Sequence, residues 1–264
     1  MKKISIITIL CLIFISIFIY YYITNRDNEE LYLGEWDGVL YTVPENQLII
    51  NLIGISGHSI KELQENILSI DFKNTEQLEI NSFNITTSNE KFQGKKIFTI
   101  EVDCSINENT EEIINEVIIS YNNGKTKNYD IGRLKVISLE RNDLLTQSDV
   151  HFLSFDTSDV YRNSIKNNSE SDIILKDLQI ENHHLEFTNI TVNGKPFKED
   201  ITIHPNEEIT IESEMSSKSN QLLYIVSPKY IYEVDTVEYN SYLDPSVVNV
   251  LELKEEQLNH MLSK

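Results

Sequence analysis

Residues 97 to 105 read IFTIEVDCS, and this stretch indicates the fold class more clearly than any other part of the chain. Apolar side chains at Phe98, Ile100, Val102 and Cys104 alternate with the side chains between them. Successive side chains of a β-strand point to opposite faces, so the spacing predicts a strand with one buried face. The segments on both sides of it carry the same signal.

Downstream, Asn122-Asn123-Gly124-Lys125 separates two apolar runs, 117–121 and 126–131. An Asn-Gly pair between such runs predicts a β-hairpin, because both central residues of its turn need positive φ. Further strands are expected at 48–53, 68–72, 78–85, 133–139, 160–166, 173–180, 185–192, 201–204, 208–215, 222–226 and 230–234, with one or two helical turns at 58–67. Short strands with few helices between them favour β-sandwiches.

A weak internal repeat indicates two such sandwiches. Phe72-Lys73-Asn74 leads into LEINSFNI (78–85), and Ile165-Lys166-Asn167 leads into IILKDLQI (173–180), with apolar residues at places one, three, six and eight of each octet. Together with the strand and turn pattern of 187–215, this resembles tandem immunoglobulin-like β-sandwich domains of bacterial membrane-anchored surface proteins. The resemblance implies a fold and no functional residues, since such folds host unrelated functions.

The N-terminal segment 4–24 is apolar and uncharged, which is long enough to cross a membrane. Lys2 and Lys3 before it predict a cytoplasmic N-terminus. Bulky residues stand where a signal peptidase needs small ones, and Leu10 stands where lipidation of Cys11 would need a small residue. We therefore expect an uncleaved, single-pass signal anchor in the cell membrane, with the rest extracytoplasmic. Membrane lipid would contact Ile4, Cys11, Phe14, Tyr20, Tyr21 and Tyr22.

The predicted fold class is mainly β: a transmembrane helix, two immunoglobulin-like β-sandwich domains and a short C-terminal helix. The predicted boundaries are 1–24 for the anchor, 25–47 for a stalk, 48–140 and 141–243 for the two sandwiches, and 244–264 for the helix or tail. Within the stalk, Trp36, Tyr41 and Val43 are able to dock on a domain.

A C-terminal helix is expected at about 250–262, because Asp244-Pro245 matches a helix start and apolar residues follow it. Its apolar face is either packed on the second sandwich or free to dock in a partner's groove. That face comprises Val247, Leu251, Leu258, Met261 and Leu262.

Composition excludes some functions. The formal net charge of −20 repels nucleic-acid phosphates, so no nucleic-acid partner is expected. We interpret the same charge as a contribution to solubility rather than as a sign of a cation-binding site. The chain contains two cysteines, Cys11 and Cys104, whose positions exclude a disulfide framework, and Cys104 is expected to be a small buried residue. The absence of alanine indicates an AT-rich, bacterial genome.

No motif for catalysis, metal or cofactor binding rises above chance. Gly54-Ile55-Ser56-Gly57-His58 lacks the second glycine of a nucleophile elbow and is interpreted as a turn. The pair His183-His184, with His204, is interpreted as exposed turn histidines. Asp156 and Asp159 fit a solvated turn better than a Ca²⁺ loop.

The sequence therefore favours a non-enzymatic binding or scaffold protein of a bacterial envelope, with a protein partner. An accessory subunit of a membrane transport or secretion complex is the first alternative, since Ser5, Thr8, Cys11 and Ser16 are small or polar residues suited to helix contacts. A wall-acting hydrolase is the weaker alternative.

Overall fold

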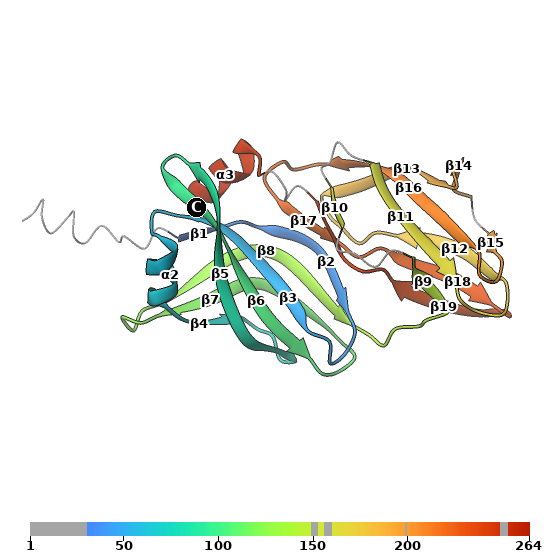
Figure 1. Ribbon diagram of the computed structural model, residues 1–264, viewed down its shortest axis with the longest axis horizontal. Coiled ribbons are helices and arrows are strands. Elements are labelled where there is room, and N and C mark those ends of the chain that lie inside the picture. The colour runs from blue at the N-terminus through green and yellow to red at the C-terminus, as the bar shows by residue number, and fades with distance from the viewer. Residues whose placement is uncertain (1–30, 149–152, 156–159, 199, 249–252) are drawn as a thin grey trace, which may run out of the picture.

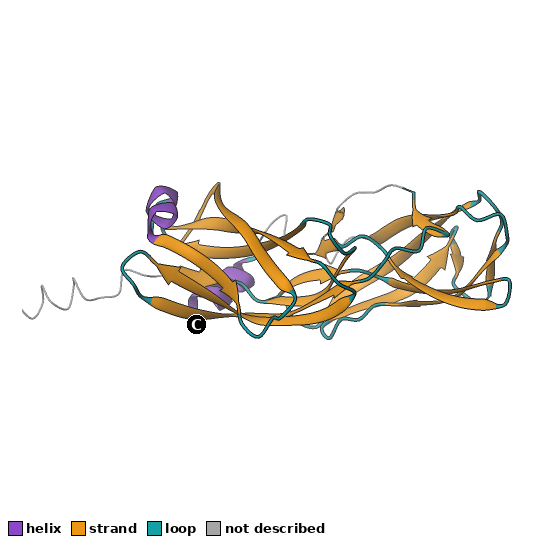
Figure 2. Ribbon diagram, turned by 90° about the horizontal axis from the view of Figure 1, so that it is seen from below, coloured by secondary structure: helices purple, strands orange, loops and turns teal. Residues whose placement is uncertain are grey.

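The computed structural model describes residues 31–148, 153–155, 160–198, 200–248 and 253–264 (Figure 1). The strands of this part form four sheets, which pair into two β-sandwiches. The two sandwiches follow one another along the long axis of the molecule in Figure 1, and the view turned by 90° in Figure 2 shows the same elongated body.

The first sandwich contains a four-stranded sheet of order β1-β3-β6-β5, facing a sheet that includes β2-β8-β7-β4. β1 and β2 are consecutive, yet β1 pairs antiparallel with β3 and β2 pairs parallel with β8 in the opposite sheet. The elements are β1 (Leu31–Leu33), β2 (Trp36–Thr42), β3 (Leu48–Ser56), α2 (Ile60–Asn66), β4 (Ile67–Phe72), β5 (Leu78–Phe92), β6 (Lys95–Ile106), β7 (Thr110–Tyr121) and β8 (Thr126–Ser138).

The second sandwich has sheets of order β14-β13-β16-β11-β9 and β15-β12-β18-β19. Its elements, together with three strands and a helix that lie outside its two sheets, complete the chain. They are β9 (Leu145–Gln147), β10 (Leu153–Phe155), β11 (Val160–Asn167), β12 (Ile173–Gln179), β13 (Leu185–Val192), β14 (Lys195–Pro196), β15 (Ile201–Ile203), β16 (Glu208–Ser217), β17 (Leu223–Val226), β18 (Lys229–Val234), β19 (Val237–Tyr242), β20 (Ser246–Val248) and α3 (Glu255–Leu262).

Both sandwiches have the immunoglobulin-like arrangement, in which strands A, B, E and D form one sheet and C, F and G the other. These strands are β1, β3, β6, β5 and β4, β7, β8 in the first sandwich, and β9, β11, β16, β13 and β12, β18, β19 in the second. The predicted likeness to tandem immunoglobulin-like sandwiches is therefore confirmed at the level of the fold.

β6 confirms the strand predicted from IFTIEVDCS. It lies between β3 and β5, and Phe98, Ile100, Val102 and Cys104 are each no more than 1% exposed. The alternation predicts this buried face, and its burial in the core of the first sandwich stabilises the fold through the hydrophobic effect. The same burial raises the pKa of the Cys104 thiol to about 12, which keeps it in the unreactive thiol form.

The predicted hairpin at Asn122–Lys125 joins β7 to β8, but its turn differs from the prediction. The Gly124 N–H donates to the Tyr121 carbonyl, and Gly124 alone of these four residues has positive φ, at +82°. This is a type I turn followed by a left-handed glycine. Both central residues have positive φ instead at Asn193 (+50°) and Gly194 (+73°), between β13 and β14.

The internal repeat has a structural cause in a shared β-bulge. Against β6, residue Ile80 pairs with Cys104 but Ser82 pairs with Asp103, so Asn81 is extra. Against β18, residue Leu175 pairs with Tyr232 but Asp177 pairs with Ile231. An extra residue at place four of both octets returns places six and eight to the face of places one and three.

Two predicted segment ends differ in the structure. The stalk predicted for 25–47 contains β1 and β2, and every residue of β2 is buried. The helix predicted at about 250–262 is α3, which begins at Glu255, but Asp244-Pro245 is followed by β20 and not by a helix start. In both cases pairing with a distant strand overrides the local pattern.

The predicted fold class includes a transmembrane helix at the N-terminus, and that part of it is corrected. Segment 4–24, with all six predicted anchor residues, lies outside the described residues. Within the described part, α2 has seven residues and α3 eight, and neither is long and apolar enough to cross a membrane. The membrane localisation predicted from the segment is corrected with it.

Candidate functional site

One hydrogen-bonded sheet joins the two sandwiches. β17, which connects β16 to β18 of the second sandwich, pairs parallel with β2 of the first. β20 pairs with β17 and β10 with β20, so the complete order is β10-β20-β17-β2-β8-β7-β4. The two sandwiches are therefore joined by backbone hydrogen bonds as well as by the chain between them.

Gly38 permits this pairing. Its φ is +155°, and a Cβ atom at this position would lie 1.8 Å from the carbonyl oxygen of Ile225 on β17. No side chain fits there without separating the two strands. Next to it, the Leu223 N–H donates to the Glu35 carbonyl at 2.8 Å, which continues the contact beyond the strand.

Asp37 fastens the other face of β2 to the second sandwich. It is 3% exposed, and its Oδ2 accepts from the backbone N–H groups of His183 and His184, both at 3.2 Å. The ring Nδ1 of His184 lies 3.0 Å from the same oxygen. Asn182 donates from Nδ2 to the Asp37 carbonyl at 3.0 Å. A buried carboxylate needs such partners, and these come from the loop that links β12 to β13.

The histidine pair therefore lies in a turn with exposed side chains, as the sequence predicts. The sequence does not predict their backbone bonds to Asp37. Asp37 itself is the one signal, because it is a single acid in the otherwise apolar or small run Trp36–Tyr41. His204 lies apart and pairs with Asp172 at 2.9 Å. Among the described residues, no group of three or more His, Cys, Asp or Glu side chains could hold a metal ion.

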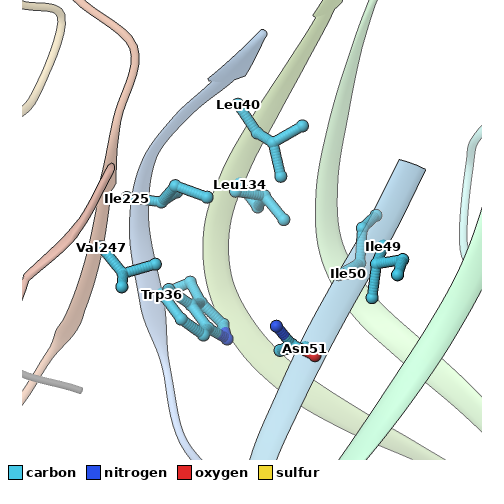
Figure 3. A pocket seen from close by; sticks show the side chains of 8 residues that line it. All are labelled: Trp36, Leu40, Ile49, Ile50, Asn51, Leu134, Ile225 and Val247. Carbon is cyan, nitrogen blue, oxygen red and sulfur yellow. The ribbon is translucent and has the colours of Figure 1, made fainter. Parts of the chain in front are cut away.

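A narrow cleft lies between the two sheets of the first sandwich, beside the junction (Figure 3). Its volume is about 20 Å³, which is room for about one water molecule and far below the size of a small-ligand pocket. The buried Trp36 Nε1 has no hydrogen-bond partner, and Asn51 faces it across the cleft in Figure 3. The cleft is lined by Trp36, Leu40, Ile49, Ile50, Asn51, Leu134, Ile225 and Val247.

The predicted docking face of the C-terminal segment lies against the protein's own first sandwich. Leu258 and Met261 of α3 and Val247 of β20 are buried in its core, and Leu262 is partly buried against it. Leu251 lies outside the described residues. The helix is also tied down by Glu35, which accepts from His260 Nε2 at 3.2 Å and forms an ion pair with Lys264. The described part of this face is therefore not open to a partner.

A groove of about 350 Å³ with a mixed apolar and polar lining opens on the second sandwich, between β12 and β13, and we call it the edge groove. Leu185 on its floor is buried, whereas the four other apolar side chains are only partly buried. Its apolar lining consists of Leu178, Ile180, Leu185, Phe187 and Ile190, and its polar lining of Asn182, Glu186, Thr188 and Lys218. Asn182 of the Asp37-bound loop is part of this lining, so the junction and the groove share a residue.

Both strands beside the edge groove have open backbone edges. β15 pairs with β12 only at 173–175, and β14 pairs with β13 only at 191–192. No other strand of the described residues pairs with the outer side of 185–188. The His184 carbonyl accepts from the N–H of Lys218, the residue after β16. The alternation of the antiparallel ladder of β13 and β16 therefore directs the backbone groups of Leu185 and Phe187 outward.

The remaining sequence candidates lie elsewhere. The turn interpretation of Gly54–His58 is correct only for its last two residues, because Gly54, Ile55 and Ser56 end β3 and pair with β6. Ser56 is fully buried, and its Oγ accepts from the His58 N–H. Asp156 and Asp159 lie outside the described residues.

No family model matches this chain, and no curated protein matches it. Solved structures resemble it in fold. A protein of unknown function from Porphyromonas gingivalis W83 is 9% identical, with 82% of this chain and 98% of that chain covered and a TM-score of 0.24. The CFA/I enterotoxigenic E. coli adhesin CfaE is 7% identical, covering 79% and 81%, with a TM-score of 0.27. The C-terminal domain of the Streptococcus agalactiae AgI/II polypeptide BspA is 7% identical, covering 83% and 98%, with a TM-score of 0.20. These likenesses assign no function.

Proposed function

We propose that this chain is a non-enzymatic protein-binding module whose edge groove receives a segment of a partner protein. One observation carries the proposal: partly exposed apolar side chains and open strand edges meet at the same place, between β12 and β13. Extended protein segments use both features, through backbone hydrogen bonds and side-chain pockets.

The chemistry of the groove favours binding over catalysis. Among its polar residues, Glu186 and Lys218 form an ion pair, and their side chains are 51% and 57% exposed. Both side chains are about half exposed to water, so the pair is not held in the fixed, enclosed geometry that general acid–base or nucleophilic catalysis uses. The partner is a protein rather than a nucleic acid, because the net charge of −20 repels phosphate.

The shared sheet supports a scaffold role for the molecule as a whole. A groove held by a fixed frame loses less conformational entropy on binding than one on a mobile loop. Here the frame reaches the groove through the hydrogen bonds of Asn182, His183 and His184 to Asp37.

Selection from a random peptide library displayed on phage tests the proposal, with immobilised full-length protein as the target. We expect the enriched peptides to bind an Ile180→Asp variant about tenfold more weakly than the native protein. Val237→Asp is the matched control, because Val237 is 51% exposed on β19, an edge strand of the sheet that contains β12. The proposal fails if nothing is enriched, or if the enriched peptides bind all three proteins equally.

A further inference from the structure

We infer that the edge groove takes an extended peptide as an additional strand on β13, with apolar side chains alternating with lysine or arginine. The inference rests on the proposed function and adds the conformation and chemistry of the bound segment. It follows from the backbone, the side chains and the charges around β13, taken in turn.

The backbone offers a partly unused ladder. Glu186 and Thr188 face β16, whereas Leu185 and Phe187 face the open side. The Leu185 N–H is already donated to Asn182 Oδ1 at 2.8 Å. The Leu185 carbonyl and both backbone groups of Phe187 therefore remain for an added strand.

The side chains set a period of two in the bound segment. Leu185 and Phe187 point inward, towards Leu178 and Ile180, while Glu186 is exposed on the outer face between them. Residues directly opposite in paired strands share a face. Every second side chain of an added strand would therefore lie against the apolar side of the edge groove, and those between would lie beside Glu186.

The charges favour a cationic segment. On the outer face of this sheet, Glu186, Glu208, Glu212 and Glu214 outnumber Arg162, Lys166 and the neighbouring Lys218. A second copy of this chain also has a strand edge to offer, but it brings a further charge of −20, which repels. Opposite charges on neighbouring strands attract, so lysine or arginine suits the outward positions of the segment.

The test uses a synthetic probe peptide, acetyl-(Lys-Val)4-amide, with the full-length protein. Backbone amide exchange is followed by nuclear magnetic resonance with and without the peptide. We expect the Phe187 amide to exchange at least about tenfold more slowly in the complex, because its N–H gains an acceptor. Exchange at Glu186, which faces β16, serves as the internal reference.

Three further comparisons use the affinity of the probe. We expect Glu186→Lys to weaken binding by about threefold or more, and the acidic analogue acetyl-(Glu-Val)4-amide to bind about tenfold more weakly. Glu186 is exposed, so the Glu186→Lys substitution does not disturb the packing of the core. Two further probes are methylated on alternate backbone nitrogens, one on the odd-numbered residues and one on the even-numbered residues. Only one edge of an added strand pairs with β13, so one of these two probes should lose binding and the other should keep it.

The outcomes separate the two proposals. If the phage-selected peptides require Ile180 but lack the alternating cationic pattern, or leave the Phe187 amide unchanged, the strand-addition inference is overturned and the binding function stands. If no peptide, including the probe, depends on Ile180, both are overturned. Protection at Phe187 together with the losses from Glu186→Lys and the acidic analogue supports the inference.

Discussion

At the scale of single residues, Asp37 carries the contact between the second sandwich and β2. Replacing it by alanine leaves the His183 N–H without its acceptor and the His184 N–H with Asn182 Oδ1 alone, at a partly buried site. We expect Asp37→Ala to reduce the free energy of unfolding by about 1–3 kcal/mol, the cost of buried donors left unsatisfied. Urea denaturation followed by tryptophan fluorescence measures it, since Trp36 is the neighbouring residue and the single tryptophan of the chain.

The matched control for Asp37 is Asp172, which also pairs with a histidine. Here the side chains of His204 and Asp172 are 68% and 54% exposed, so solvent screens the pair. We expect Asp172→Ala to change stability by less than about 0.5 kcal/mol. If Asp37→Ala and Asp172→Ala lose the same amount of unfolding free energy, the buried Asp37 carboxylate does not stabilise the junction as we describe.

Gly38 is the second residue on which the junction depends. Gly38→Ala should lower the unfolding free energy by about 3 kcal/mol or more, because its Cβ would overlap the Ile225 carbonyl and β17 would have to move. Thermal unfolding of Gly57→Ala provides the control, since a Cβ there meets nothing within 4 Å. A Gly38→Ala protein as stable as the control would show that β17 does not pair closely with β2.

The contacts of Asp37 and Gly38 show which features of the junction cannot be predicted from the sequence alone. The turn at His183-His184 is predictable from Asn182, whose side chain accepts from His184 and Leu185 just after it. Their bonds to Asp37 are not, because 146 and 147 positions separate the partners. The edge groove is hidden for the same reason, since it exists only where β14 and β15 are too short to cover their neighbours.

At the scale of elements, α3 is a structural part of the first sandwich. Met261 is 1% exposed in that core, so Met261→Ala should cost about 2–4 kcal/mol through lost burial and an unfilled cavity. Glu256→Ala, on the exposed side of the same helix, should be neutral. Chemical denaturation of both variants checks this, and unchanged stability of Met261→Ala would mean that α3 is not docked.

The end of α3 should also respond to pH. Partial burial tends to raise the pKa of Glu35, but hydrogen bonds and charge from Lys264 and His260 outweigh it, so the net pKa lies below the usual 4.5. A carboxyl with a depressed pKa stabilises the fold above its ordinary pKa, and this contribution disappears as the pH falls through the lower folded-state value.

We therefore expect Glu35→Gln to be less stable than the native protein near pH 7, with the difference shrinking as the pH falls below about 4. Unfolding midpoints measured across this range give the result. Glu255→Gln, at the exposed start of the helix, is the reference. A difference in stability that stays constant with pH would mean that the ionised Glu35 carboxylate does not help to hold α3 in place.

Elements with strong local patterns are predictable, and those defined by distant pairing are not. β6 and the hairpin of β7 and β8 follow from alternation and an Asn-Gly turn. β20 replaces the start of the predicted helix because Ser246–Val248 pairs with β17 and β10. β2 was expected in a stalk, although its nearly continuous apolar run is typical of a strand buried on both faces.

At the scale of the whole molecule, the two sandwiches are joined by strands as well as by side chains. The stack of Tyr41 on Tyr242, with ring centroids 5.4 Å apart, and the ion pair of Lys135 with Glu181 at 2.9 Å add to the shared sheet. The predicted domain boundary near residue 140 remains a prediction about independent folding. What the structure adds is that β17 and β20 cross to the first sandwich after that boundary.

The central claim is that the shared sheet makes the two sandwiches one rigid frame for the edge groove. Pulsed electron resonance between spin labels at Ser82→Cys on β5 and Glu238→Cys on β19, both exposed positions, tests it most directly. Cys11 is replaced by serine, and Cys104 is buried and does not label. We predict a single narrow distance distribution, unchanged by the probe peptide, whereas a broad or two-peaked distribution in the native protein would contradict the claim.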